Sequence, residues 1–218
     1  MTVGLIFDID GTLVTFRFDV QGTRSALLSE MTRMGFSTTG LTLSSPTVKI
    51  MESVREQAAS GARDYQSARA RLYSILDRFE AESSANATIF PGTVETLKFL
   101  KKKSVKLGVL TNSGRRAALP LLARYSLTEY FDFVLTRDDV DAMKPAPDGI
   151  HRALSLMVLP KEHVFYVGDS TLDIMAAKGA GLKVISVATG NYNAQRLRAE
   201  GSEFVIESLA ELPRLLSL

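Results

Sequence analysis

Short apolar runs rich in β-branched residues alternate with segments of helical length along most of this 218-residue chain. Each run reads as a buried strand, and six strands are expected, at residues 3–7, 105–111, 131–136, 163–169, 183–188 and 203–207. A segment of helical periodicity precedes each strand after the first, at residues 93–103, 115–126, 148–157, 171–181 and 193–201. Such alternation implies right-handed crossovers and a parallel sheet covered on both faces. We therefore predict an α/β fold with a doubly wound, Rossmann-like core.

A helical insert follows the first strand, because residues 15–89 contain no convincing strand. One helix is expected around Val20 to Met34, where an apolar stripe recurs at helical spacing. A second helix is expected to begin with Ser45 as its N-cap and Pro46 in its first turn. The predicted domains are a core of residues 1–14 and 90–218 and a helical domain of residues 15–89.

The charge balance argues against nucleic acid as a partner. A net charge of +2 and a pI near 8.8 are too mild for a protein whose ligand demands a concentrated basic face. The one basic run, residues 101–103, closes an expected helix, where cations complement the negative end of the helix dipole. The absence of cysteine excludes a disulfide framework, a thiolate nucleophile and a zinc–thiolate site.

No apolar stretch approaches the roughly 18 residues that a membrane helix needs. The N-terminal apolar run lacks a basic leader and is broken by Asp8, so it does not read as a signal peptide. We expect a cytoplasmic protein with no membrane partner, either a monomer or a homodimer.

Acidic and polar residues follow the carboxyl ends of several expected strands. In an open parallel sheet these ends lie at one edge, in the crevice where ligands bind. Residues that follow different strands are therefore expected to be neighbours in space. They are Asp8 and Asp10 after the first strand, Thr111 and Asn112 after the second, Lys144 after the third, Asp169 after the fourth, and Asp173 one helical turn further on.

Such a cluster of carboxylates predicts a bound cation. Two bare carboxylates about 4 Å apart repel by about 4 kcal/mol at an effective dielectric constant of about 20. Oxygen ligands with no cysteine or histidine nearby suit Mg²⁺, which prefers carboxylates, retained waters and substrate phosphate. The sequence therefore predicts a magnesium site at this edge of the sheet.

These residues have the chemistry for phosphoryl transfer, which depends on an in-line nucleophile and on stabilised charge at the equatorial oxygens. Asp8 is the candidate nucleophile, with Mg²⁺ and Lys144 offsetting its repulsion from the phosphate. Asp10 can protonate the leaving oxygen and then draw a proton from water. The Thr111 hydroxyl and the backbone amides from Asn112 onward offer donors to phosphate oxygens.

Four motifs in this order resemble the haloacid dehalogenase-like superfamily, in its phosphatase branch. They are "DIDGTL", "LTNSG", "KPAPD" and "GDSTLDIMAAKGAG", and the resemblance spans nearly the whole chain. The insert is similar to the helical cap of phosphoglycolate phosphatase-like members, which closes over small phosphorylated substrates. Relatives that remove halides lack the second aspartate of the first motif, so Asp10 favours phosphate chemistry.

The resemblance implies roles for single residues. It makes Asp8 the nucleophile and Asp10 the general acid and base, while Thr111 and Lys144 bind the transferring group. It also implies that Mg²⁺ is held by the Asp8 carboxylate, the Asp10 backbone carbonyl and Asp169, with Asp173 supporting the metal shell. The segment "VTFRFD" departs from the pattern of many relatives and places Arg17 near the cap, where it is a candidate substrate-binding residue.

The expected function is therefore Mg²⁺-dependent hydrolysis of a small phosphorylated metabolite through an aspartyl-phosphate, with phosphoglycolate as the substrate that the resemblance suggests. A phosphosugar mutase that uses the same intermediate stays open. So do two readings of another class, a phospho-receiver and a non-catalytic binding protein. His151 and His163 fall within a helix and at the start of a strand, and we expect both to be structural.

Overall fold

The structure is a computed structural model that describes residues 3–15, 17–61 and 64–218. Six strands form one sheet in the order β3-β2-β1-β4-β5-β6, and every neighbouring pair is parallel. Their bounds are β1 Gly4–Phe7, β2 Lys106–Leu110, β3 Phe133–Leu135, β4 Val164–Gly168, β5 Lys183–Val187 and β6 Phe204–Ile206. The predicted strands and the doubly wound parallel sheet are confirmed.

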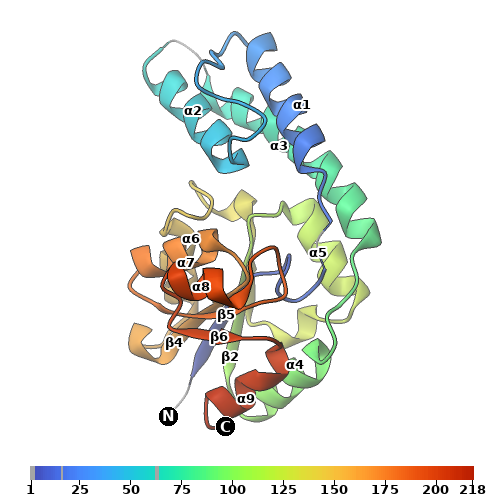
Figure 1. The fold of residues 1–218 in the computed structure, drawn as a ribbon, viewed down its shortest axis with the longest axis vertical. Helices are drawn as coiled ribbons and strands as arrows, with labels where there is room; N and C mark the ends of the chain where they lie inside the picture. Colours follow the sequence, from blue (N-terminus) through green and yellow to red (C-terminus); the bar gives the residue numbers. More distant parts are fainter. Residues whose placement is uncertain (1–2, 16, 62–63) are drawn as a thin grey trace. The chain divides into compact units, whose positions relative to one another are not determined.

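Helices cover both faces of this sheet (Figure 1). One face packs against α4 Thr93–Lys102, α5 Arg115–Arg124 and α9 Leu212–Leu215. The other face packs against α6 Asp148–Met157, α7 Thr171–Gly179 and α8 Ala194–Ala199. Four short 3-10 helices complete the core: η1 Thr128–Tyr130, η2 Arg137–Asp139, η3 Lys161–His163 and η4 Leu209–Glu211.

The N-terminus of α7 is fixed by reciprocal hydrogen bonds. Ser170 Oγ accepts from the Asp173 N–H at 3.3 Å, and Asp173 Oδ2 accepts from the Ser170 N–H at 3.0 Å. This capping box satisfies two backbone donors that a helix start leaves unpaired. It also holds the Asp173 side chain in place, directly after β4.

The insert consists of the helices α1 Val20–Arg33, α2 Thr47–Ala59 and α3 Tyr65–Asn86. Apolar side chains such as Leu27 and Leu72 are fully buried within it. The predicted start of the second helix is wrong by one residue. Pro46 has an extended backbone and is itself the N-cap, without a side-chain cap, while Ser45 Oγ accepts from the Thr42 N–H.

The chain divides into two compact units, one of Met1–Phe16 with Asn86–Leu218 and one of Arg17–Ala85. Within the first unit, the segment that leaves β1 pairs with the segment that returns from the insert. The Thr15 N–H donates to the Thr88 carbonyl at 2.7 Å, and Val14 forms an antiparallel bridge with Ile89. The domain limits predicted from the sequence, at residues 14/15 and 89/90, stay a prediction.

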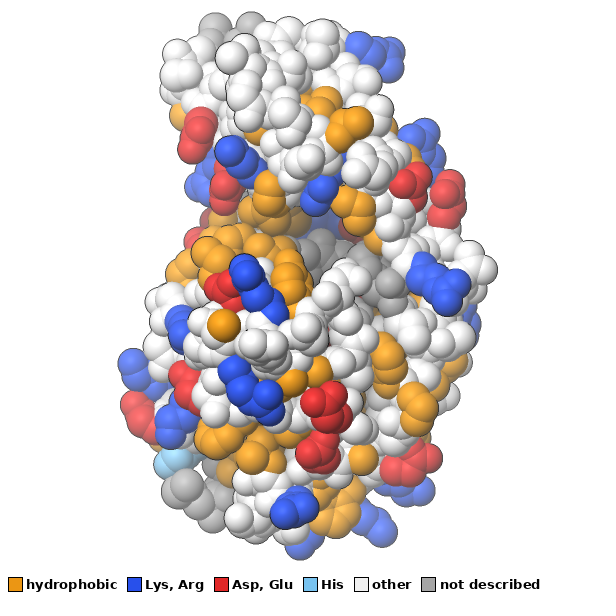
Figure 2. All heavy atoms as spheres, in the orientation of Figure 1, with side chains coloured by type: hydrophobic (Ala, Val, Ile, Leu, Met, Phe, Trp, Pro, Cys, Tyr) orange, Lys and Arg blue, Asp and Glu red, His pale blue; other side chains and the backbone are white. Residues whose placement is uncertain are grey.

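The surface charges agree with the mild net charge. On the face drawn in Figure 2, basic and acidic side chains are interspersed rather than gathered by sign. None of the helices in the described part of the chain has the length and apolar character that a membrane crossing requires.

Candidate active site

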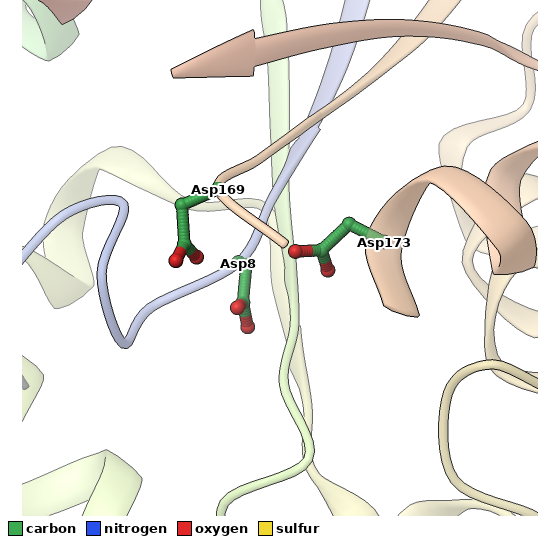
Figure 3. A group of neighbouring side chains, drawn as sticks. All are labelled: Asp8, Asp169 and Asp173. Carbon is green, nitrogen blue, oxygen red and sulfur yellow. The ribbon is translucent and has the colours of Figure 1, made fainter. Parts of the chain in front are cut away.

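Three carboxylates converge at the carboxyl edge of the sheet (Figure 3). Asp8 follows the central strand β1, Asp169 follows its neighbour β4, and Asp173 lies in the first turn of α7. One oxygen from each lies within 4.8 Å of the others, and all three residues are buried. The strand ends thus bring together residues separated by more than 150 positions in the sequence.

Lys144 is the cation of this cluster. It lies in the loop between η2 and α6, and the peptide bond to Pro145 is cis. Its ammonium nitrogen is 2.9 Å from Asp8 Oδ1 and 2.6 Å from Asp173 Oδ1, and the side chain is only 4% exposed. Burial opposes the charge on Lys144, but the charges of Asp173 and Asp8 outweigh it and raise the pKa well above its ordinary value.

The carboxylates are costly to ionise together. Burial raises the pKa of Asp8 to about 7, and the charges of Asp173 and Asp10 add to the rise while Lys144 opposes it. Burial and the charges of Asp173 and Asp8 also raise the pKa of Asp169. One lysine therefore does not neutralise the cluster, and a further cation would stabilise it.

These residues fit a magnesium ion. The donor set consists of carboxylate oxygens, which Mg²⁺ prefers. Asp8 Oδ1 is buried, and among the described residues it receives no hydrogen bond of acceptable geometry besides its ion pair with Lys144. The Asp10 carboxylate is not part of the group of three, and the predicted metal contact through the Asp10 backbone carbonyl stays a prediction.

The turn after β2 provides hydroxyl and amide groups. Thr111 is 2% exposed, and its Oγ1 accepts from the Ser113 N–H at 3.1 Å. Its own hydroxyl proton is therefore directed to a different acceptor. Both polar atoms of the Asn112 side chain bind the backbone of Lys144, with Nδ2 donating to the carbonyl and Oδ1 accepting from the N–H, each at 2.9 Å. Asn112 thus holds the loop that carries the lysine.

Side chains next to the cluster hold Asp10 and Asp169. Ser113 Oγ donates to Asp10 Oδ2 at 2.5 Å, and Thr12 Oγ1 donates to Asp169 Oδ1 at 3.3 Å. Ser113 was not singled out from the sequence, although its hydroxyl lies two residues after Thr111 in the motif "LTNSG" and could have been predicted to lie at the site.

Three other candidates are not members of the carboxylate cluster. Arg17 is exposed in the helical unit, where its predicted role in substrate binding stays a prediction. His151 lies within α6, and His163 ends η3 just before β4. The two histidines therefore lie in the elements predicted from the sequence, and neither belongs to the carboxylate cluster.

Glycines make room for the carboxylates. A Cβ added at Gly190 would stand 1.7 Å from Asp169 Oδ2, and one at Gly168 would stand 2.4 Å from Asp173 Cγ. Gly11 combines such a close approach to Asp169 with a φ of +81°. Nothing in the sequence shows that the backbone at Gly190, after β5, packs against a predicted metal ligand.

Tyr166 is a second buried polar residue at the site that was not singled out from the sequence. It lies in β4 with no exposed surface, and its hydroxyl contacts the Lys144 ammonium at 2.8 Å. Within the apolar run "HVFYVGD" it reads as a core residue. The hydrogen-bond partner of its hydroxyl, Lys144, lies in a loop that precedes the strand by about 20 residues, so the strand pattern does not show the contact.

The family model described as haloacid dehalogenase-like hydrolase matches residues 5–187. The chain belongs to this family. A phosphoglycolate phosphatase of Pseudomonas aeruginosa is 28% identical to this hydrolase over 95% of its chain and 77% of the relative. A haloacid dehalogenase-like hydrolase of Bacteroides fragilis is 28% identical, with a TM-score of 0.69 over 97% of this chain and 100% of the other.

A third comparison bears on the fold alone. A structure described as a β-phosphoglucomutase, from Thermotoga maritima, is 24% identical to this hydrolase, with a TM-score of 0.64 over 100% of this chain and 99% of the other. The predictions of the family and of the fold are therefore confirmed.

Proposed function

We propose that this hydrolase is a Mg²⁺-dependent phosphatase that cleaves a small phosphomonoester through a phosphorylated Asp8. The observation that carries the proposal is the buried Asp8 carboxylate at the end of the central strand, 2.9 Å from the Lys144 ammonium and grouped with two further carboxylates. The coarser prediction, a phosphatase of this family, has the support of the family match and of the relatives.

In the first proposed step, an Asp8 carboxylate oxygen forms a bond to phosphorus while the bond from phosphorus to the ester oxygen breaks. The Lys144 ammonium lies beside Asp8 and offsets the repulsion between the carboxylate and the phosphate. The raised pKa of Asp8 supports the need for this positive charge, because the carboxylate must be ionised to attack.

Asp10 is proposed to move the protons. It gives a proton to the leaving alkoxide in the first step. It then accepts a proton from the water that attacks phosphorus, and this releases inorganic phosphate and restores the Asp8 carboxylate. The hydrogen bond from Ser113 holds one Asp10 oxygen and fixes the orientation of the carboxylate.

When bound, Mg²⁺ would supply positive charge to the phosphate oxygens. The residues proposed to hold it are Asp8, Asp169 and the Asp10 backbone carbonyl, with Asp173 in support. Asp169 is in turn oriented by the Thr12 hydroxyl and by the Gly190 backbone that packs against it.

Thr111 and Lys144 are proposed to bind the transferring phosphoryl group. The Thr111 hydroxyl already accepts one hydrogen bond and has its proton to donate. Asn112 is proposed to contribute to substrate binding through its backbone N–H, since its side chain is engaged with Lys144. Arg17 is proposed to meet the non-phosphate end of the substrate.

Phosphoglycolate is the proposed substrate. The support is the similarity to relatives such as the phosphoglycolate phosphatase of Pseudomonas aeruginosa, which this chain matches over nearly its whole length. A small phosphate ester whose other end is a carboxylate also suits a helical domain that carries exposed cations such as Arg17.

The test is phosphate release from phosphoglycolate and from an aryl phosphate, with Mg²⁺ and with EDTA. We expect the wild type to require the metal and Asp8→Asn to lose turnover. Asp148→Asn is the matched control, because it removes the same charge from an exposed helix start outside the cluster. Undiminished release by Asp8→Asn would refute Asp8 as the nucleophile.

The mutase alternative has weaker support, because the mutase neighbour is 24% identical and bears on the fold alone. The same assay separates the two functions. A phosphatase releases inorganic phosphate in step with substrate loss, whereas a mutase converts a sugar phosphate into its isomer with little release.

A further inference from the structure

Tyr166 carries a hydroxyl into the apolar core beneath the site. Its side chain is fully buried on the face of the sheet that packs against α6, α7 and α8. Packing alone would be served by phenylalanine, which has the same ring and no polar group to desolvate. The hydroxyl therefore requires an explanation from the groups around it.

The hydrogen bonds of this hydroxyl have a defined direction. Lys144 Nζ can only donate, so the 2.8 Å contact makes the Tyr166 oxygen an acceptor. The single hydroxyl proton then goes to the Leu110 carbonyl at 2.9 Å. The phenol thus ties the ammonium to the end of strand β2.

The ammonium of Lys144 has three protons and four oxygen atoms around it, of which the Leu110 carbonyl is the most distant at 3.5 Å. Asp173 Oδ1 lies at 2.6 Å, Tyr166 Oη at 2.8 Å and Asp8 Oδ1 at 2.9 Å. Asp173 and Tyr166 accept the two shortest hydrogen bonds of the ammonium, and the charge that they hold lies beside Asp8 as an ion pair. Because a lysine side chain is flexible by itself, the contacts with Asp173 and Tyr166 determine the position of the ammonium group.

We propose that Tyr166 is a positioning residue whose hydroxyl, together with Asp173, aims the Lys144 ammonium at Asp8 and at the phosphoryl group. The inference rests on the proposed function of Lys144 and goes beyond it, because it names the group that orients this charge. Tyr166 has no exposed surface, so it acts through the lysine and does not touch the substrate.

Tyr166→Phe isolates the hydroxyl. The ring, whose centroid lies 5.4 Å from Lys144 Nζ, stays in place, and the core loses a single oxygen. Tyr130→Phe is the matched control, since it removes a phenolic hydroxyl in η1, before β3 and hence at the opposite edge of the sheet. Both variants are compared with the wild type in Mg²⁺, with an aryl phosphate as substrate.

We expect kcat/KM of Tyr166→Phe to fall by about ten- to one-hundredfold, the effect of losing a hydrogen bond to a charged group. The inhibition constant of inorganic phosphate should rise, because the ammonium is less well aimed at the phosphate. This constant is the decisive readout, since a smaller folded fraction lowers kcat without changing the affinity of the folded molecules. Tyr130→Phe should match the wild type in both quantities.

Two results would overturn the proposal. One is a Tyr166→Phe enzyme that equals the wild type in kcat/KM and in phosphate inhibition. The other is a lower kcat with unchanged phosphate inhibition, which would make the hydroxyl important for folding only.

A wild type that hydrolyses no phosphomonoester would instead refute the proposed function. Calorimetric binding of inorganic phosphate with Mg²⁺ then makes the same comparison without turnover, with weaker binding by Tyr166→Phe expected and equal binding contradicting the role.

Discussion

Ser113 Oγ donates a 2.5 Å hydrogen bond to Asp10 Oδ2 and so links the turn after β2 to the turn after β1. Ser113 is buried, whereas Asp10 is half-buried. The proposed acid and base of the reaction is therefore held by a residue from a different motif. Its carboxylate is oriented before any substrate is present.

Replacing Ser113 by alanine should lower kcat by about tenfold or more, since a hydrogen bond to a charged carboxylate is lost. KM should change little, because the proposed task of Asp10 is to transfer protons rather than to bind the phosphate. Steady-state hydrolysis of an aryl phosphate measures both constants. Ser155→Ala is the control, because its hydroxyl donates to the Arg152 carbonyl within its own helix. A rise in KM with kcat unchanged would mean that Ser113 binds substrate instead.

Gly190→Ala should weaken the activation by Mg²⁺. The added Cβ would stand 1.7 Å from Asp169 Oδ2, so the carboxylate or the loop must move. A titration of activity against Mg²⁺ should show a higher half-saturating concentration. Gly179→Ala is the matched control, since its Cβ would meet Pro147 at an ordinary 3.4 Å. Equal metal dependence in the two variants would show that Asp169 tolerates the displacement or does not bind the ion.

The sheet could be predicted because its strands are buried on both faces. Ile6 and Phe7 point to opposite faces and both are fully buried, so the run in β1 is apolar at every position. This is the pattern expected of a parallel sheet between two helical layers. The gathering of Asp8 and Asp169 followed from the shared direction of the strands.

The contacts around the cluster could not be predicted in the same way. Tyr166 and Lys144 are 22 residues apart and meet through a loop whose path the sequence does not specify. A tyrosine within an apolar strand is expected to be a core residue, so the hydrophobic pattern of the strand does not indicate that its hydroxyl binds a charged group. At Gly190 the close approach depends on the packing of two loops, which leaves no periodic signal.

Asp169→Asn should not destabilise the metal-free protein. Burial and the charges of Asp173 and Asp8 raise the pKa of Asp169, so its ionised form is unfavourable at neutral pH without a cation. The amide keeps an oxygen that can accept from Thr12. In EDTA the variant should therefore melt at the same temperature as the wild type or higher.

The same variant should lose most of the stabilisation by Mg²⁺. Binding to the native state raises the melting temperature of the wild type, by about 2–4 °C per kcal/mol for a chain of this size. Thermal unfolding with and without the metal measures the difference. An equal Mg²⁺ shift in the wild type and in Asp169→Asn would place the ion elsewhere.

Asp132 should make stability depend on acid pH. Partial burial opposes its ionisation, but hydrogen bonds from Lys101 and from the Leu107 N–H outweigh this and hold its pKa below the ordinary value of 3.8. A carboxyl group whose pKa is lowered in the folded state stabilises that state at pH values above its unfolded pKa. The contribution is lost as the pH falls through the lower, folded-state value.

Because the Asp132 side chain is 41% exposed, solvent screening limits the effect to about 1 kcal/mol or less. Urea unfolding should therefore find Asp132→Asn less stable than the wild type at pH above about 5, with the difference shrinking below about pH 4. A difference that is constant across this range would mean that the hydrogen bonds, and not the charge, carry the contribution.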